Sequence, residues 1–312
     1  MIYLTEEDVK SLVAMDDSIA ALEGAFGQWN DPSRANLPRR RLDLPKKYFN
    51  VMAAAIPGSD IFGYRGYTSA IRFNLLVLLS LKREEPIALI ECGWLSRTRT
   101  GAASGLATKY LARDDAKIMG LIGTGRISAD QVRAVAAVRK LEELRVYSRD
   151  AEKRDWFAGE MAKEFDFSVI SAETAEACVD NADIITTATN SKEPVLMGDW
   201  LKPGAHVNGA GANDGKRREI DEPALFKSDI VVVDDLEQAE IEAGILIDTI
   251  NQNQFSWDKV VELGDIVSGT KPKRTSPEQI TFFHSLGLAF EDVAFGSLIY
   301  DKAIQTGIGR EV

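Results

Sequence analysis

With 312 residues the chain is longer than a single hydrophobic core usually serves, so we expect two domains. Its composition, 45% hydrophobic and 27% charged, is ordinary for a globular protein, and its formal charge of −11 argues against nucleic acid as a partner. No apolar run approaches the roughly 18–20 residues of a membrane span, and two cysteines with no CxxC or HExxH spacing suit a cytoplasmic protein without a metal site.

The first part of the chain predicts two short helices and then a set of antiparallel strands. Thr5 has the position of an N-cap, and a second helix is expected to begin near Asp16 or Asp17. The segment from Asn30 to Lys47 contains three prolines and a basic cluster, and we expect it to be a loop. Closely spaced strand-like runs follow at residues 48–56, 64–71, 74–81 and 87–91, and an alanine-rich helix is expected at 98–112.

From Ala116 onward, strand-like and helix-like segments alternate, which is typical of a parallel sheet covered on both faces. We therefore place the domain change at Asp114-Asp115. After Gly264 the chain is read as helix starts and loops, and a long final helix is expected from Leu286 to about Thr306. The fold class expected is α/β. It combines a Rossmann-type doubly wound parallel sheet at 115–287 with an α+β domain at 1–114 and 288–312 that has a mainly antiparallel sheet.

A glycine turn joins one expected strand, 118–122, to an expected helix that begins at Ser128. In the pattern G-x-G-x-x-G, the first glycine (Gly123) permits a tight turn and the second (Gly125) lets the backbone approach a pyrophosphate. The negative charge of that pyrophosphate is met by free N–H groups at the helix N-terminus. This context predicts a dinucleotide site. The turn residues expected to bind the cofactor are Gly123, Thr124, Gly125, Arg126 and Ile127.

The end of the second strand of that domain indicates which dinucleotide is bound. An acidic residue is usual there, because its carboxylate binds the ribose 2′-hydroxyl of NAD. This chain instead has Ser148-Arg149, which would favour a 2′-phosphate through charge-assisted hydrogen bonds, with Arg126 adding to the same positive pocket. NADP(H) is therefore the preferred cofactor. The alternative is that Asp150 still serves the ribose and that NAD(H) binds.

The segment Thr186-Thr187-Ala188-Thr189 follows a central strand of the expected parallel sheet, at the edge where such sheets place cofactor loops. We expect Thr187, Ala188 and Thr189 to contact the ribose and nicotinamide side of the cofactor. The alternative is an ordinary β-branched strand end.

Several motifs, in order along essentially the whole chain, resemble the ornithine cyclodeaminase/μ-crystallin family. They are Arg97-Thr-Arg99-Thr-Gly-Ala-Ala, Tyr110-Leu-Ala-Arg113, the glycine turn, Trp200-Leu-Lys-Pro-Gly-Ala-His-Val-Asn208, Arg218-Glu-Ile-Asp221, Thr281-Phe-Phe-His-Ser-Leu-Gly287 and Glu291-Asp292. The family includes cyclodeaminases, archaeal-type alanine dehydrogenases and ketimine reductases. The resemblance implies a homodimer, with a substrate and dimerisation domain built from the N-terminal portion and the last helix.

The resemblance also implies the substrate-binding residues. An arginine that grips the substrate carboxylate corresponds to Arg99, and a second one corresponds to Arg41, with Arg39 as the alternative. A planar guanidinium suits this task because it can hold a carboxylate in a bidentate way. Ser285, Leu286 and Gly287 correspond to residues near the nicotinamide amide.

Three positions depart from the cyclodeaminase pattern. Arg65 replaces an expected lysine, Asn50 replaces a glutamate in the substrate site, and Asn213, followed by Asp214, replaces an aspartate. Cyclodeamination needs groups that titrate near neutral pH, and neither arginine nor asparagine does. We therefore expect Arg65, Asn213 and Asp214 to form the catalytic set of a simpler reaction.

That reaction is the NAD(P)H-dependent reduction of the imine of a small 2-oxo acid, or oxidation of the matching amino acid. Three arginines around one substrate also suit a second acidic group on it. Two alternatives stay open. Asp214 could sustain ornithine or lysine cyclodeaminase activity, or the chain could be a non-catalytic NADP(H)-dependent binding protein of the μ-crystallin type.

Overall fold

The computed structural model describes residues 1–312, which divide into two compact units. One unit comprises Met1–Arg99 and Gly287–Val312, and the other comprises Thr100–Leu286. The division falls inside helix α3 (Gly93–Leu111), whereas the domain boundary expected from the sequence lies at Asp114-Asp115. Because the structural division lies earlier in the chain than the expected one, the second half of this helix belongs to the unit with the parallel sheet. Each unit is described by itself.

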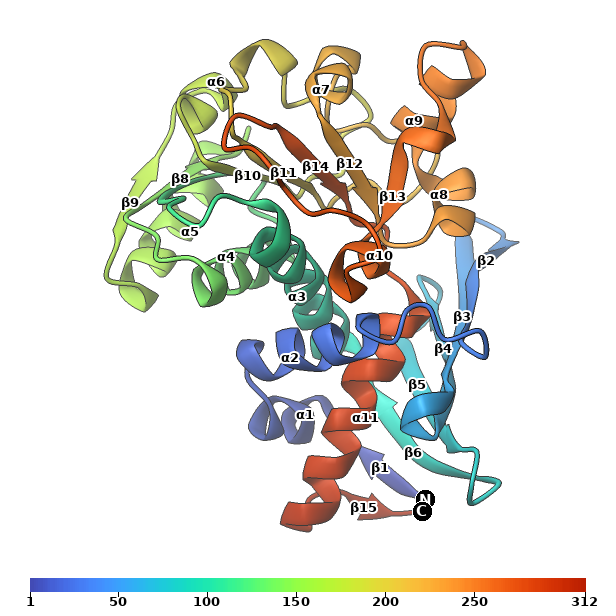
Figure 1. Cartoon of the computed structure of the whole chain (residues 1–312). Coiled ribbons are helices and arrows are strands. Elements are labelled where there is room, and N and C mark those ends of the chain that lie inside the picture. Colours follow the sequence, from blue (N-terminus) through green and yellow to red (C-terminus); the bar gives the residue numbers. More distant parts are fainter. The chain divides into compact units, whose positions relative to one another are not determined.

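The first unit is built around a seven-stranded, mainly antiparallel sheet with the order β15-β1-β6-β5-β4-β3-β2 (Figure 1). Its strands are β1 (Ile2–Leu4), β2 (Ala35–Leu44), β3 (Lys47–Ile56), β4 (Ile61–Thr68), β5 (Phe73–Ser80), β6 (Glu85–Glu91) and β15 (Arg310–Glu311). Only the pairing of β1 with β6 is parallel. The antiparallel pairing expected from closely spaced strands is confirmed.

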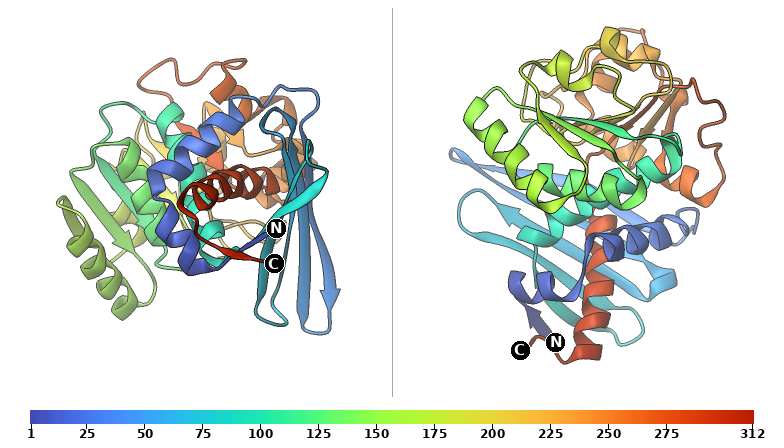
Figure 2. Two further views of the ribbon diagram at one scale, coloured as in Figure 1. Left: turned by 90° about the horizontal axis from the view of Figure 1, so that it is seen from below. Right: turned by 90° about the vertical axis from the view of Figure 1, so that its left-hand side faces the viewer.

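Three further helices complete this unit: α1 (Glu6–Leu12), α2 (Met15–Phe26) and α11 (Ala289–Thr306). Thr5 caps α1, as expected, in a reciprocal pair with Asp8. Helix α11 lies along one face of the sheet, against β2 to β5 (Figures 1 and 2). Fully buried aromatic rings join the end of α2 and the turn that follows it to α11, since Phe26 and Trp29 both contact Phe290. Burial of these large apolar side chains stabilises the unit.

The expectation of a loop from Asn30 to Lys47 is wrong, because β2 occupies ten residues of that segment. Strand β2 is the last strand of the sheet, and an edge strand tolerates proline because one row of its N–H groups needs no partner strand. Pro38 lies where the register with β3 shifts, between Leu37 and Arg40, which is a β-bulge. The bulge places the side chains of Pro38 and Arg39 together in buried positions.

The second unit contains an eight-stranded, fully parallel sheet with the order β13-β12-β14-β11-β10-β7-β8-β9. The strands are β7 (Ile118–Ile122), β8 (Glu143–Tyr147), β9 (Ser168–Ser171), β10 (Ile184–Thr187), β11 (His206–Gly209), β12 (Ile230–Val233), β13 (Val260–Glu262) and β14 (Thr281–His284). The strand order reverses between β7 and β10, which is the switch point where doubly wound sheets bind their ligands. The α/β fold class is confirmed.

One of these strands, β14, lies after Gly264, where only helix starts and loops were expected for the rest of the unit. Strand β14 is four residues long and buried on both faces, so it shows no alternation of polar and apolar residues. It lies between β11 and β12. The strand that carries His284 to the carboxyl edge of the sheet is therefore one that the sequence pattern did not predict.

Helices cover both faces of the parallel sheet. They are α4 (Ser128–Val138), α5 (Ala151–Glu164), α6 (Ala175–Val179), α7 (Glu222–Lys227), α8 (Leu236–Glu242), α9 (Gly244–Asn251) and α10 (Leu263–Ser268). The adjacent residues Ile184 and Ile185 of β10 belong to different apolar clusters, one packed with α4 and α5 and the other with α6 to α9. Such double coverage gives the continuous apolar strands seen here. No helix has the length and apolarity needed to cross a membrane.

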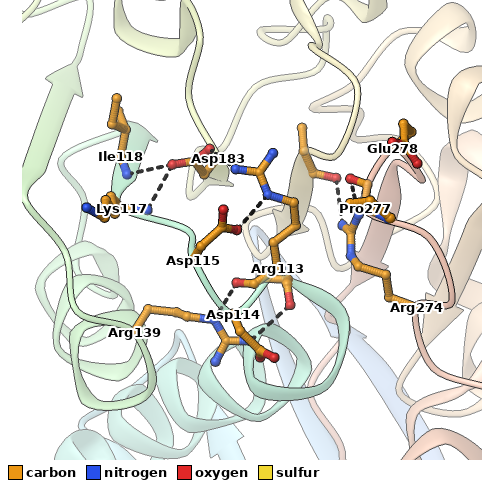
Figure 3. A network of polar contacts seen from close by, with 12 residues as sticks. Arg113, Asp114, Asp115, Lys117, Ile118, Arg139, Asp183, Arg274, Pro277 and Glu278 are labelled. Carbon is orange, nitrogen blue, oxygen red and sulfur yellow. Dashed lines mark hydrogen bonds and ion pairs between the residues drawn. The ribbon is translucent and has the colours of Figure 1, made fainter.

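An ion-pair network lies at the amino ends of the parallel strands (Figure 3). The carboxylate of Asp183 accepts hydrogen bonds from the N–H groups of Lys117 and Ile118, at 2.8 and 3.0 Å, and pairs with Arg113 and Lys202. The guanidinium of Arg139 donates to carbonyl groups at the C-terminal end of α3. These contacts satisfy carbonyls that a helix end leaves without partners, and they hold the C-terminal part of α3 to the parallel sheet of the second unit.

Candidate functional site

The glycine turn in the second unit has the form that a dinucleotide pyrophosphate requires. Gly123 has a φ of 110°, and a Cβ there would lie 2.5 Å from the carbonyl oxygen of Ala188, so no other residue fits. A Cβ on Gly125 would meet nothing nearer than 3.7 Å, and this residue is exposed. The first glycine is therefore required by the protein itself, while the second leaves the backbone open to a ligand.

Some N–H groups of this turn are available to bind an anion. The N–H of Gly125 donates to the Ser128 hydroxyl at 2.9 Å, and the N–H of Gly123 donates to the carbonyl of Tyr147 at 2.8 Å. The N–H groups of Thr124 and Ile127 have no acceptor within the protein. Free N–H groups at the start of α4 suit a phosphate, so the residues present fit a dinucleotide.

The residues after β8 bear on the ribose of that dinucleotide. Ser148 is half-buried and Arg149 is exposed, directly after the strand. Asp150 is the N-cap of α5: its carboxylate accepts the N–H of Lys153 at 3.2 Å and pairs with the ammonium of the same residue at 3.0 Å. Asp150 thus has a structural role as the N-cap, whereas the side chains of Ser148 and Arg149 have none.

A buried carboxylate joins two loops at the carboxyl edge of the sheet. Glu219, 4% exposed, accepts hydrogen bonds from Thr189, after β10, and from Gly211 and Ala212, after β11. Burial raises the pKa of its carboxyl group, and the donors on Thr189 and Gly211 act in the opposite direction. In the sequence, Glu219 stands out only as part of the motif Arg218-Glu-Ile-Asp221. Its pairing with Thr189, thirty positions away, gives no local signal.

The loop after β11 also carries Asn213 and Asp214. The carboxylate of Asp214 accepts the N–H of Lys216 at 2.9 Å and pairs with the Arg217 guanidinium at 3.2 Å. Asp214 thus closes a local turn. The neighbouring Asn213 is half-buried in the same loop.

Strand β14 brings His284 and Ser285 to the same edge. The Nε2 atom of His284 lies 2.9 Å from the carbonyl oxygen of Ala212, so Nε2 carries the hydrogen. Burial lowers the pKa of His284 to about 4, which keeps the ring neutral. The Nδ1 atom of His284 and the hydroxyl of Ser285 are buried without a protein partner. Polar atoms of this kind suit a site that receives a polar ligand.

The remaining predicted residues of this unit lie close by. Thr187 ends β10 and Ala188 follows it, with the Ala188 N–H donating to the carbonyl of Ile122 at 2.8 Å. The N–H of Leu286 donates to a carboxylate oxygen of Asp234. The glycine turn, the loop after β10 and the end of β14 therefore occupy one edge of one sheet, as its topology requires.

In the first unit, Arg65 and Arg99 meet at one carboxylate. Asp292, in the first turn of α11, lies 3.1 Å from Nη1 of Arg65 and 2.7 Å from Nε of Arg99. Glu291 lies 2.8 Å from Nη1 of Arg99, and all four side chains are buried. Burial raises the pKa of Asp292, but the charges of both guanidinium groups outweigh this effect and hold it below its usual range.

Arg65 is held in one orientation. Its Nε donates to the side-chain carbonyl of Asn74 at 2.9 Å, its Nη1 contacts Asp292, and its guanidinium stacks on the Tyr67 ring at 4.6 Å. Its Nη2 has no partner in the protein. A fixed cation with free N–H groups can bind a carboxylate but cannot supply a base.

Arg41 and Asn50 lie opposite each other in the register of β2 and β3, and the Nε of Arg41 is 3.2 Å from the Asn50 side-chain oxygen. Arg41 is exposed and its guanidinium also lies over the Tyr48 ring. Asn50 is two positions from Met52, whose partner in β4 is Arg65, so Arg41, Asn50 and Arg65 share one face of the sheet.

Arg39, the alternative to Arg41, has a different position. It is 6% exposed and its Nη2 donates to the carbonyl of Gly287 at 2.8 Å. Gly287 has a φ of 80°, and a Cβ there would lie 2.5 Å from Nη1 of Arg99. Arg39 and Arg99 therefore both lie against Gly287, and only glycine fits between them.

The chain is similar to known proteins over essentially its whole length. The model of the "Ornithine cyclodeaminase/mu-crystallin family" matches residues 1–307. A Delta(1)-pyrroline-2-carboxylate reductase of Bacillus thuringiensis subsp. konkukian is 32% identical over 327 residues, covering 100% of this chain and 99% of that protein. The Thermococcus litoralis Delta(1)-pyrroline-2-carboxylate reductase, solved with NADH and L-proline, has 32% identity and a TM-score of 0.94 over 100% of both chains. An archaeal alanine dehydrogenase dimer with bound NAD has 29% identity and a TM-score of 0.92, over 100% of this chain and 98% of that one.

Proposed function

Because this chain belongs to the ornithine cyclodeaminase/mu-crystallin family, we propose that it is an NAD(P)H-dependent oxidoreductase that reduces the imine of a small 2-oxo acid or oxidises the matching amino acid. The observation that carries this proposal is the state of Arg65. Asn74 and Asp292 fix the orientation of this guanidinium, which is a cation by its own chemistry, at a position where cyclodeaminase chemistry would need a group that releases a proton.

The arginines of the first unit would bind the substrate through its carboxylate. Nη2 of Arg65 and the exposed guanidinium of Arg41 offer N–H groups to it, and Asn50 fixes the Nε of Arg41. Asp292 and Glu291 orient Arg99, whose planar group would form the central part of this clamp. Holding the substrate in a reactive geometry supplies several kcal/mol of barrier reduction by itself.

The second unit would hold the nicotinamide dinucleotide, which when bound exchanges a hydride with the substrate carbon. Residues 123–127 would bind the pyrophosphate, and Thr187, Ala188, Thr189, Ser285 and Leu286 would surround the nicotinamide and its ribose. Gly287, for which the same role is proposed, follows directly in the chain and is counted with the first unit. We further propose that NADP(H) is preferred over NAD(H). Asp150 is committed to capping α5, and Ser148 and Arg149 suit a 2′-phosphate.

The role of the loop after β11 follows from its charges. Asp214 pairs with the Arg217 guanidinium at 3.2 Å, and its carboxylate would orient the amine or iminium nitrogen. Asn213 would add a neutral hydrogen bond there. The substrate would then arrive as a protonated imine, and no further general base is needed for its reduction.

We also propose a homodimer formed through the open face of the antiparallel sheet. Side chains alternate across a strand, and those of β3 to β5 that face away from α11 are largely apolar. They are Val51, Ala53, Ala55, Phe62, Tyr64, Leu75, Val77 and Leu79. An apolar face of this extent is typical of a protein–protein interface, and the archaeal alanine dehydrogenase is a dimer.

The test is a panel of 2-oxo acids with ammonia or methylamine, together with cyclic imines such as Δ1-pyrroline-2-carboxylate, followed by the oxidation of NADPH and NADH. Turnover of one member supports the proposal. Tight NADPH binding without any turnover would identify a binding protein, and ammonia release from ornithine or lysine would identify a cyclodeaminase. Arg99→Ala should raise the apparent KM at least about tenfold, whereas the exposed Arg72→Ala should not.

A further inference from the structure

We propose that Glu219 is a positioning residue that couples the loop on the cofactor side, after β10, to the loop after β11 that carries Asn213 and Asp214. The inference rests on the proposed function for the roles of these two loops. It goes beyond that function because it names the side chain that fixes the positions of these two loops relative to each other. All the residues concerned lie in the second unit.

Each oxygen of the Glu219 carboxylate accepts hydrogen bonds from a different loop. Oε1 accepts the N–H of Thr189 at 2.7 Å and the hydroxyl of the same residue at 2.8 Å. Oε2 accepts the N–H of Gly211 at 2.7 Å and the N–H of Ala212 at 3.1 Å. Each oxygen therefore holds one loop with two donors, and one rigid planar group spans both.

The loops also touch directly at Gly211. A Cβ on this residue would lie 2.1 Å from the Thr189 carbonyl oxygen, 2.4 Å from the Thr189 nitrogen and 2.6 Å from Oε1 of Glu219. No side chain fits between the two loops and the carboxylate. A displacement of Thr189 is therefore transmitted to Gly211 both by contact and through Glu219.

A second buried group fixes the same loop from strand β14. His284 donates from Nε2 to the carbonyl of Ala212 at 2.9 Å, while Glu219 accepts the N–H of Ala212. Both backbone polar groups of Ala212 are therefore held by buried side chains. Asn213 and Asp214 follow immediately, so their backbone begins from a fixed point.

This geometry requires two acceptor oxygens. A glutamine has the same shape but only one oxygen, and its NH2 group would face two N–H or O–H donors. It can therefore satisfy one loop and must repel the other, since a buried donor left without an acceptor is costly. An aspartate is one methylene shorter but keeps both oxygens, so it should preserve the coupling in weakened form.

The experiment compares the wild type with Glu219→Gln and Glu219→Asp, and uses Glu193→Gln as the matched control with an exposed carboxylate. Hydrogen–deuterium exchange of segments 187–191 and 209–214 is measured with and without NADPH, together with the Kd for NADPH by fluorescence. In the wild type, NADPH should slow exchange in both segments. In Glu219→Gln it should slow exchange in one segment only, and the Kd should rise at least about tenfold.

We also expect Glu219→Asp to restore the protection of both segments. Glu193→Gln should behave as the wild type. Equal protection of both segments and an unchanged Kd in Glu219→Gln would overturn the inference. Should that variant not fold, Thr189→Val removes one donor to Oε1 and carries the same test, with wild-type coupling again overturning the proposal. Neither readout needs turnover. A protein with coupled loops that reduces no imine contradicts only the proposed function, and an active reductase with independent loops contradicts only this inference.

Discussion

The Nε atom of Arg99 lies 2.7 Å from Oδ1 of Asp292, and both side chains are buried. The two residues belong to different segments of the first unit: Arg99 is in α3 and Asp292 in the first turn of α11. The carboxylate also contacts Arg65 from β4. One aspartate therefore sets the orientation of two of the guanidinium groups proposed to bind the substrate.

Replacing this aspartate should affect both stability and substrate binding. Asp292→Asn leaves two buried guanidinium groups without their shared negative charge, and breaking such a pair costs about 3–5 kcal/mol of unfolding free energy. The apparent KM for the imino acid should rise as Arg65 and Arg99 lose their orientation. Urea denaturation and steady-state kinetics measure the two effects. Asp301→Asn, an exposed change on the same helix, is the control, and equal effects of both variants would contradict the role of Asp292.

Cofactor preference should depend on the residue after β8. Ser148→Asp places a carboxylate where the 2′-phosphate is proposed to bind, and like charges repel. The Kd for NADPH should rise about tenfold or more, while the Kd for NADH stays within about twofold or falls. Fluorescence titration with each cofactor gives both values. A wild-type protein that already binds NADH more tightly than NADPH would show that Asp150 or another group serves the ribose.

Stability should fall on mild acidification because both histidines are buried. Burial lowers the pKa of His206 to about 3 and that of His284 to about 4, whereas an unfolded histidine has a pKa near 6.5. Below this value the unfolded state takes up protons that the folded state does not. The free energy of unfolding should therefore decrease by about 1.4 kcal/mol per pH unit for each histidine.

Urea denaturation at pH 7, 6 and 5 measures this slope. His284→Gln keeps a donor for the Ala212 carbonyl but cannot titrate, so it should remove about half of the slope. A wild-type stability that is constant over this range would contradict the neutral, buried state of these rings.

The oligomeric state should depend on the open face of the antiparallel sheet. Tyr64 and Val77 are partners in the register of β4 and β5 and both face away from α11. Tyr64→Asp with Val77→Asp would place two charges in a dry interface, which costs several kcal/mol. Sedimentation velocity should show a monomer, while Ile304→Asp, an exposed change on α11, should leave the dimer intact. A dimer that survives the double change would place its interface elsewhere.

Local patterns were enough to predict much of the fold. The run Ile118–Ile122, the glycine turn and the helix from Ser128 have signals that do not depend on distant residues, and they are found where they were expected. Strand β2 was missed because prolines usually indicate loops, although an edge strand with a bulge accepts them. Strand β14 was missed because a strand buried on both faces shows no alternation.

The site was harder to predict because its contacts are long-range. The arginines could be named from motifs, but no spacing rule brings Arg65 to Asp292, more than two hundred residues later. The same holds for Glu219 and Thr189, whose relation arises only when β10 and β11 become neighbours in the sheet. Residue types thus indicated the chemistry, while their orientation required the tertiary structure.

Strands β1 and β15 pair directly, with Ile2 opposite Glu311, and the two ends of the chain lie side by side (Figure 2). This has a consequence for biosynthesis. On the ribosome, strands β2 to β6 emerge before the whole of the second unit, and α11 follows only afterwards. The face of the antiparallel sheet that α11 covers therefore stays without this helix until the last part of the chain is made, and exposed apolar surface of this kind favours aggregation during folding.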